Sequence, residues 1–214
     1  MKIKLTLTQE MLGTKALNAQ IFGDFIASKR PGGPASDEIE NAELAQEAAD
    51  KAEASGTSIF HRQEEQLGIY DYQIKGFFKD AASAMNRFDK EYRMGMEKLT
   101  AFKSKIDSCI FVRPRFIVFK LPKGLEVGIC ERPIRADTAQ GPRVGLCRSE
   151  TVPQGTELVI DVAVMSKDLK PYVEMWLDYG QLRGLGQWRN SGKGTFTWEE
   201  VGGKKGSKAI WAAA

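Results

Sequence analysis

The sequence predicts an α+β fold, and three segments carry that prediction. Residues 2–8 alternate polar and apolar side chains, which is typical of a half-buried strand. From Tyr70 onward, large apolar residues recur at spacings of three and four, the period of a helix that packs on one side. Residues 156–165 are rich in β-branched residues and apolar on both faces, so we expect this strand at the centre of a sheet.

The first helix has Asp71 available as an N-cap, because its carboxylate can accept hydrogen bonds from N–H groups of the first turn. Its apolar stripe consists of Ile74, Phe77, Phe78, Ala81 and Met85. The same spacing continues through Phe88, Tyr92, Met96 and Leu99. We expect a break at Asn86 or Gly95 to divide this stretch into two helices.

The second half of the chain is richer in strands. Residues 110–121 are mainly β-branched and aromatic, and Pro114 indicates a sheet edge or a bulge. A turn at 122–124 predicts that residues 125–129 return as the second strand of a hairpin. Residues 132–148 are interrupted by Pro and Gly and carry the arginines Arg132, Arg135, Arg143 and Arg148. We expect an irregular excursion there.

A second helix is predicted after Asp168, its expected cap, with Pro171 in the first turn. A final strand places Phe196 and Trp198 on one face. The order is therefore strand, helix, strand pair, strand, helix, strand. This order is that of a ferredoxin-like antiparallel sheet with helices on one face, and we predict a single domain over residues 1–214.

Two insertions interrupt that plan, an excursion over residues 130–150 and an acidic helical arm over residues 28–68. Between Asp37 and Asp50 there are six carboxylates and no cation, and residues 36–54 are rich in Ala and Glu with few large apolar side chains. We interpret this part as a solvated helix or mobile arm.

Charge and composition exclude several classes of protein. The net charge of +3 is too small to indicate nucleic-acid binding by itself, although cations are concentrated after Arg183. No apolar run reaches the roughly 18 residues that would span a bilayer, so we expect a cytoplasmic protein. The cysteines Cys109, Cys130 and Cys147 are widely spaced, which indicates buried thiols and not a zinc site. We expect neither a metal nor a cofactor.

The segment GLGQWRNSGKGTFTWEEV, residues 184–201, is the strongest candidate for a binding site. It is no Walker phosphate loop, because five residues separate Gly186 from Gly192 where four are required, and Gly194 replaces the hydroxyl residue after lysine. A dinucleotide fingerprint fails because the segment follows a helix. The remaining residues suit the backbone of a single-stranded nucleic acid: Arg183, Trp188, Arg189, Gly192, Lys193 and Gly194. The alternative is a tight connection with solvated cations.

This segment resembles the glycine-rich loop of the RAMP superfamily, whose members form backbone and RNA-processing subunits of CRISPR effector complexes. Two further parts are similar to the superfamily in the same order. TQEMLGT followed by YDYQIKGFFKDAASAM resembles the region up to the first helix, and SETVPQGTELVIDVAV resembles the strand entered through a proline-glycine turn. The acidic arm has no counterpart in the superfamily, and Gly68-Ile69-Tyr70-Asp71 replaces the usual lead into the first helix.

The resemblance implies an RNA-recognition-like sheet that holds RNA by its phosphate backbone. It places Lys75 and Gly76 of the first helix near RNA, together with Arg183, Gly192, Lys193 and Gly194 of the loop. It also places the arginine-rich excursion, with Arg132, Arg135 and Arg143, where backbone subunits carry a protruding thumb. The implied partners are single-stranded RNA and further copies of the chain or other CRISPR-type subunits.

Two alternatives stay open beside this RNA-binding prediction. His61, the single histidine, could assist a metal-independent endoribonuclease, but it lies in the polar stretch Phe60-His61-Arg62-Gln63-Glu64 and is better interpreted as a surface residue. We therefore favour a protein without catalytic activity. The other alternative is an interaction protein of a mobile element, such as a virion component or an inhibitor that imitates a CRISPR subunit. In that case the acidic arm would be the contact surface.

Overall fold

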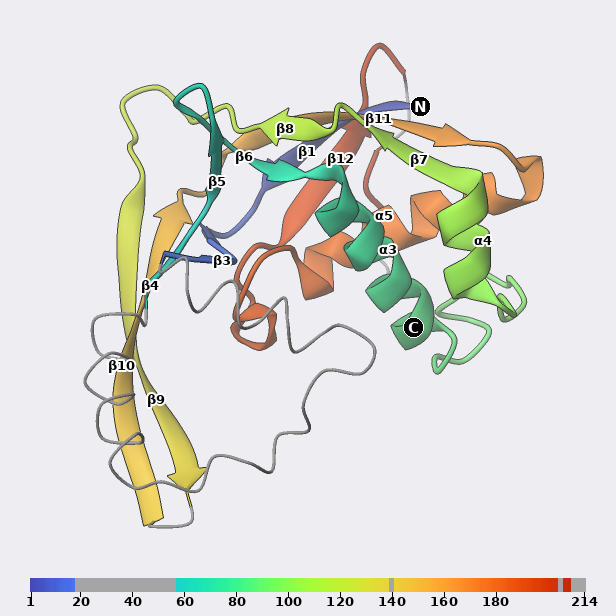
Figure 1. Ribbon diagram of the computed structural model, residues 1–214. Helices are drawn as coiled ribbons and strands as arrows, with labels where there is room; N and C mark the ends of the chain where they lie inside the picture. Colours follow the sequence, from blue (N-terminus) through green and yellow to red (C-terminus); the bar gives the residue numbers. More distant parts are fainter. Residues whose placement is uncertain (18–56, 139–140, 204–205, 209–214) are drawn as a thin grey trace. The chain divides into compact units, whose positions relative to one another are not determined.

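The computed structural model describes residues 1–17, 57–138, 141–203 and 206–208 of the chain (Figure 1). The chain divides into two compact units. The first comprises Met1–Met11, His61–Glu126 and Val152–Ala214, and the second comprises Leu12–Phe60 and Val127–Thr151. The predicted helix and arm over residues 36–54 lie outside the described residues.

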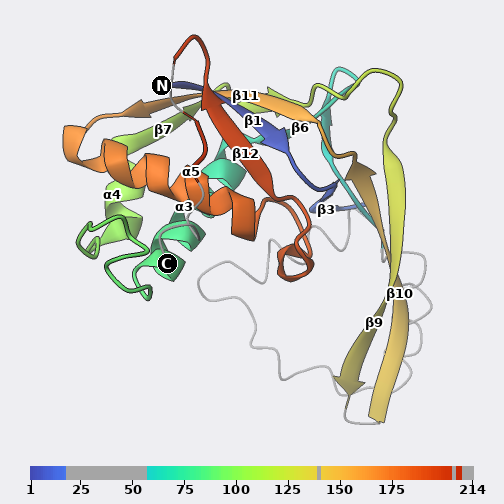
Figure 2. The same ribbon diagram turned by 180° about the vertical axis from the view of Figure 1, so that it is seen from behind.

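The first unit is built on a four-stranded antiparallel sheet. Its strands are β1 (Lys2–Leu7), β7 (Ile110–Arg113), β11 (Glu157–Val164) and β12 (Phe196–Glu200), in the order β12-β1-β11-β7. The helices α3 (Asp71–Met85) and α5 (Lys170–Arg183) lie on the same side of this sheet (Figures 1 and 2). The two strand-helix-strand halves interleave so that β1 and β11 are central. This is the predicted ferredoxin-like α+β arrangement, and the central place of β11 is confirmed.

The core of this unit lies between the sheet and its helices. In β1 the buried residues are Ile3, Leu5 and Leu7, the face that the alternation predicts. The helices contribute Ile74, Phe77, Phe78, Ala81, Met85, Val173, Trp176 and Leu177. Gly180 of α5 packs on β12, because a Cβ there would lie 2.2 Å from Cζ of Phe196. Each large apolar side chain buried in this way contributes about 1.5–3 kcal/mol.

Helix α3 begins and ends close to the predicted positions. Its N-cap is Tyr70 and not Asp71, and the Tyr70 N–H donates to Oε1 of Gln73 at 3.0 Å. The predicted break at Asn86 is confirmed, because this residue ends the helix. Its side-chain amide donates to the Leu99 carbonyl and accepts from the Leu99 N–H, both at 3.0 Å. The second helix expected over residues 88–99 is wrong: Phe88 and Tyr92 lie in a bend and a turn, Met96 and Leu99 lie in irregular chain, and the next helix, α4 (Phe102–Cys109), begins only afterwards.

Asp168 does not cap α5. It lies within the short 3-10 helix η1 (Lys167–Leu169), and α5 begins directly afterwards with Pro171 in its first turn, as predicted. Pro171 fits there because the first N–H groups of a helix have no intrahelical partner.

The predicted hairpin between residues 110–121 and 125–129 is wrong. Strand β7 ends at Arg113, because Pro114 has no N–H to continue the ladder. The chain then forms β8 (Phe116–Val118), which pairs with β6 (Gln66–Tyr70) in a small sheet that also holds β5 (His61–Gln63). β7 is the edge strand that Pro114 indicated.

The second unit contains a long hairpin where an irregular excursion was expected. The hairpin consists of strands β9 (Gly128–Thr138) and β10 (Gly141–Val152). Their antiparallel pairing begins with Gly128 opposite Thr151 and ends with Thr138 opposite Gly141. Strand β10 also pairs with β4 (Thr57–Ile59), and the sheet includes β2 (Met11–Leu12) and β3 (Lys15–Ala16). Residues 57–68, which were predicted to belong to a helical arm, thus contribute to strands β4, β5 and β6.

Within the described ranges, every helix is too short or too polar to cross a bilayer. The same residues contain no cluster of three or more His, Cys, Asp or Glu side chains that could hold a metal ion. The three cysteines form no disulfide and are half-buried, so they are more accessible than the predicted buried thiols.

Candidate nucleic-acid interface

The glycine-rich loop connects α5 to β12 and contains the 3-10 helix η2 (Arg189–Ser191). Its two ends cross closely, since Leu185 N–H donates to the Gly194 carbonyl at 2.8 Å. Gly194 has a φ of +73°, and a Cβ there would lie 1.9 Å from the Leu185 carbonyl oxygen. Gly192 also has a positive φ, of +80°, but a Cβ on it would meet no described atom within 4 Å. Gly194 is therefore required by the loop itself, whereas Gly192 presents open backbone to a ligand.

The cations of this loop are paired with carboxylates. Arg183 Nε lies 2.9 Å and Arg189 Nη1 lies 2.8 Å from the same Oδ2 atom of Asp80 in α3. Lys193 pairs with Glu10. Two guanidinium groups on one carboxylate leave one net positive charge, and the lysine pair leaves none. The sequence prediction counted three cations and missed both carboxylates.

Trp188 lies at the start of η2 and exposes 43% of its surface. Its φ is +54°, in the left-handed region that bulky residues rarely adopt. This backbone conformation costs about 1–2 kcal/mol and must be held by the rest of the loop. The exposed indole lies in the sequence directly beside Arg189, as a stacking residue next to a phosphate-binding cation would.

A line of residues along α3 leads to Asp80. Tyr72, Gly76 and Asp80 are four residues apart and therefore lie on one side of the helix; we call them the α3 strip. Tyr72 is 49% exposed and stacks on Tyr70, with ring centroids 5.6 Å apart and planes inclined by 13°. A Cβ on Gly76 would meet no described atom within 4 Å. The strip thus runs from stacked tyrosines past open backbone to the arginine pair.

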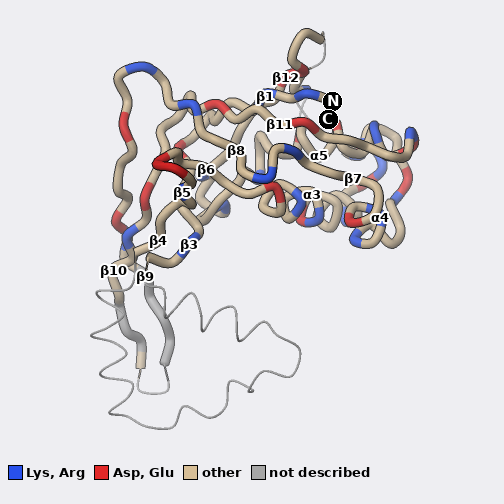
Figure 3. The backbone as a smooth tube through the Cα atoms, turned by 45° about the horizontal axis from the view of Figure 1, so that its top comes forward, with Lys and Arg blue, Asp and Glu red and all other residues tan. Residues whose placement is uncertain are grey.

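Burial raises the pKa of Tyr72, with the neighbouring Tyr70 adding to the effect. Its phenol therefore stays neutral and adds no negative charge to the α3 strip. The sequence prediction missed Tyr72, although its position one turn before Gly76 was a usable signal. Both lysine and aspartate residues occur along α3 and along α4 (Figure 3).

Lys75 lies on another side of α3 from the strip. Its Nζ atom is 3.4 Å from the Asp107 carbonyl oxygen and 5.3 Å from the ring centroid of Phe111. Lys75 and Gly76 were both predicted near RNA, but only Gly76 lies on the same side of α3 as Asp80.

The arginines Arg132, Arg135 and Arg143, which were predicted in an irregular excursion, lie in the β9–β10 hairpin of the second unit. Arg132 is half-buried, with Nη2 4.0 Å from Sγ of Cys147. In the ladder Arg135 is opposite Val144, and Arg143 is opposite Ala136. Arg148, which was not predicted to contact RNA, forms an ion pair with Glu131 at 2.6 Å.

His61 lies in β5 and is half-buried, not fully solvated. Its ring packs edge-on against Tyr70, with centroids 4.8 Å apart and an interplanar angle of 72°. This contact gives the histidine a packing role beside the aromatic residues that precede α3.

Comparison with known proteins identifies a fold neighbour and no family. No family model matches the chain, and no curated protein matches its sequence. Among solved structures, the chain is similar to a chain of the cryo-EM structure of the Type III-B Cmr-beta bound to cognate target RNA, with a TM-score of 0.50 and 15% identity. The match covers 97% of this chain and 60% of that chain. At this identity the likeness shows the fold, and this chain spans about three fifths of its neighbour.

Proposed function

We propose that this protein binds single-stranded RNA through its phosphate backbone, as a distant RAMP-like relative of CRISPR effector subunits. The observation that carries the proposal is the convergence of Arg183 and Arg189 at the end of the α3 strip. Helix α3 also contributes the uncovered backbone of Gly76 and the exposed ring of Tyr72. The glycine-rich loop contributes the uncovered backbone of Gly192 and the exposed ring of Trp188. Cations combined with exposed aromatic faces are the usual means of holding a single strand without reading its sequence.

Two further points support this proposal. The fold neighbour is a chain of a structure that was solved with target RNA bound. The motifs of the present sequence, in their order along the chain, resemble those of the RAMP superfamily. The role we propose is binding without catalysis, and we assign His61, whose ring packs edge-on against Tyr70, a packing role. Further copies or CRISPR-type subunits are the protein partners that this role implies.

The ion pairs determine how such binding should behave. A phosphate that approaches Arg183 and Arg189 competes with Asp80 for the same guanidinium groups, which are about 30% exposed. The net gain per phosphate is therefore smaller than for unpaired arginines. We expect moderate affinity with a marked salt dependence.

The double substitution Arg183→Gln/Arg189→Gln is expected to weaken binding of labelled single-stranded RNA for every sequence tested. The slope of log affinity against log salt should become shallower by about 0.7, because the two arginines together hold one phosphate and each single-strand phosphate contact contributes roughly 0.7. Fluorescence anisotropy over a series of salt concentrations measures both quantities.

Two matched variants make this test specific. Asp80→Asn removes the competing carboxylate and should tighten RNA binding. Lys103 is an exposed cation on α4, and Lys103→Gln should leave the RNA affinity and its salt dependence unchanged. If the double variant keeps wild-type affinity and slope, the loop is only a connector and the proposal fails.

Gly76→Ala is expected to raise the free energy of unfolding by up to about 1 kcal/mol, because alanine is the better helix former and its methyl group meets open space. RNA affinity should fall at the same time, since the methyl group blocks close approach to the helix backbone. Denaturant unfolding and anisotropy on the same preparations separate these effects. A stabilised variant with unchanged affinity would remove Gly76 from the interface.

A further inference from the structure

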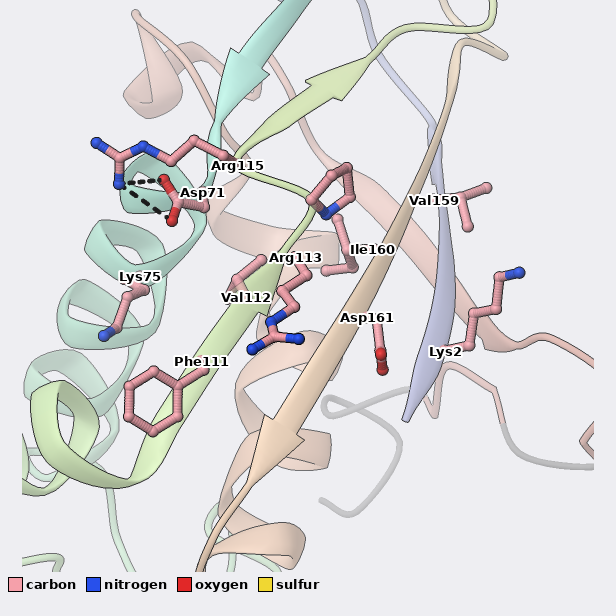
Figure 4. Close-up of a pocket in the computed structure, with 11 residues that line it drawn as sticks. Lys2, Asp71, Lys75, Phe111, Val112, Arg113, Arg115, Val159, Ile160 and Asp161 are labelled. Atoms are coloured by element: carbon pink, nitrogen blue, oxygen red, sulfur yellow. Dashed lines mark hydrogen bonds and ion pairs between the residues drawn. The ribbon is translucent and has the colours of Figure 1, made fainter.

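A second site lies at the edge of the sheet, where β7 ends. A cavity of about 720 Å³ extends from the first turn of α3 across β7 and β11 to β1 (Figure 4). Its lining includes Lys2, Lys75, Phe111, Arg113, Arg115 and Val159. We call it the β7 groove. None of the loop residues lines it.

The floor of the groove contains a gap in the strand pairing. On its β7 side, β11 is paired from Val164, opposite Ile110, to Asp161, opposite Arg113. Pairing resumes only at Glu157, which forms a bridge with Lys120. Val159 lies in the middle of this gap.

The register decides where the backbone of Val159 points. On the β1 side, Val162 N–H donates to the Met1 carbonyl at 2.8 Å, and Leu7 N–H donates to the Thr156 carbonyl at 2.9 Å. Because antiparallel partners alternate between bonded and non-bonded pairs, the N–H and C=O of Val159 point away from β1. They therefore offer one donor and one acceptor in the gap, the complement of a nucleobase edge.

The groove is positively charged. Four of its lining residues are cations, Lys2, Lys75, Arg113 and Arg115, and two are carboxylates, Asp71 and Asp161, which leaves two net positive charges. Arg115 pairs with Asp71 at 3.1 Å. In the described part of the chain, Lys2 and Arg113 make no ion pair, in contrast to the three loop cations.

Phe111 provides an exposed aromatic ring beside these cations. It is 42% exposed and points towards α3, where Lys75 lies near its ring (Figure 4). Phe111 and Arg113 are two residues apart on one face of β7, which separates them by about 7 Å along the strand. Arg113 is paired with Asp161 of β11, and Val159 lies two residues along β11 from Asp161.

We propose that the β7 groove binds two consecutive nucleotides of single-stranded RNA. One base stacks on Phe111, the connecting phosphate lies at Arg113, and the next base meets the open edge of β11 at Val159. Ring, cation and open edge follow one another in the order base, phosphate, base. This inference rests on the proposed function for the class of ligand, but it concerns a separate surface.

The test uses the dinucleoside monophosphate ApA, which reaches two nucleotide positions only. In ¹H–¹⁵N spectra of the full chain, ApA is expected to shift the amide signals of Phe111, Arg113 and Val159. Phe111→Leu keeps an apolar side chain but removes the ring, and it should weaken ApA binding about tenfold, because the base loses the aromatic face on which it stacks. Arg113→Gln should weaken ApA binding and reduce its salt dependence.

Controls separate this site from the loop. Lys103→Gln should leave ApA binding unchanged, and Arg183→Gln/Arg189→Gln should weaken long RNA while ApA still shifts the groove amides. The inference is overturned if ApA shifts none of these amides in the wild type, or if both groove variants bind ApA as tightly as the wild type. It is also overturned if an oligoglutamate peptide shifts the same amides with equal affinity, because the occupant would then be an acidic peptide.

Discussion

Gly194→Ala is expected to lower the free energy of unfolding by about 3 kcal/mol. The residue has a φ of +73°, which costs an L-amino acid about 1–2 kcal/mol. In addition, the new Cβ would lie 1.9 Å from the Leu185 carbonyl oxygen, and such a clash in a packed site costs roughly 1–3 kcal/mol. The atom that must move is backbone, so no side-chain rotation relieves the contact.

Gly192→Ala is the matched control for this change. Its φ of +80° imposes a similar backbone cost, but the methyl group meets open space. We expect a loss of about 1 kcal/mol. Guanidinium unfolding of both variants measures the difference, and equal losses would show that the close crossing of the two loop ends is not a source of stability. RNA affinity should fall for Gly192→Ala beyond what its stability explains.

The patterns that were predicted correctly are local. Alternation in β1, the apolar period of α3 and the buried run of β11 each lie within one element, so the sequence alone is sufficient to identify them. These elements, in their order along the chain, also define the ferredoxin-like arrangement. The usual right-handed strand-helix-strand connection then determines the face of the sheet on which the helices lie.

Strand partners were harder to predict because pairing is not local. Residues 125–129 follow a turn after an apolar run, which suits a hairpin, but Pro114 ends β7 and directs β8 to β6. The arginine-rich residues 132–148 contain Pro and Gly, and they nevertheless belong to strands β9 and β10, which pair with each other in a regular ladder. Edge strands of a two-stranded ribbon tolerate such residues, which is why composition misled the prediction.

The electrostatics of the candidate site depend on contacts far apart in sequence. Asp80 precedes Arg183 by 103 residues, and Glu10 precedes Lys193 by 183 residues. Counting cations within the loop therefore overestimates the charge offered to a ligand. Asp80 and Tyr72 become visible as site residues only when the period of α3 is combined with the position of the loop.

Asp178→Ala is expected to lower the free energy of unfolding by about 2–3 kcal/mol. Asp178 is 2% exposed, and its Oδ1 accepts hydrogen bonds from Nε1 of Trp198 and from the Lys208 N–H, both at 2.8 Å. These contacts connect α5 to β12, the two elements that flank the glycine-rich loop. Alanine leaves the buried indole N–H without an acceptor, which costs about 1–3 kcal/mol, and it releases the backbone at Lys208.

Asp178→Asn separates this hydrogen bonding from the charge. Burial raises the pKa of the Asp178 carboxyl above its ordinary value of 3.8, despite the hydrogen bonds that favour its ionised form. A carboxyl with a raised pKa in the folded state contributes stability that is present below the ordinary value and lost as pH rises through the folded value. Asparagine keeps an oxygen acceptor and does not titrate. The stability of Asp178→Asn relative to the wild type should therefore increase with pH from about 4 upward, as measured by denaturant unfolding at a series of pH values. A difference that decreases over this range would mean that the hydrogen bonds to Trp198 and Lys208 outweigh desolvation, and that the folded protein favours the ionised carboxylate.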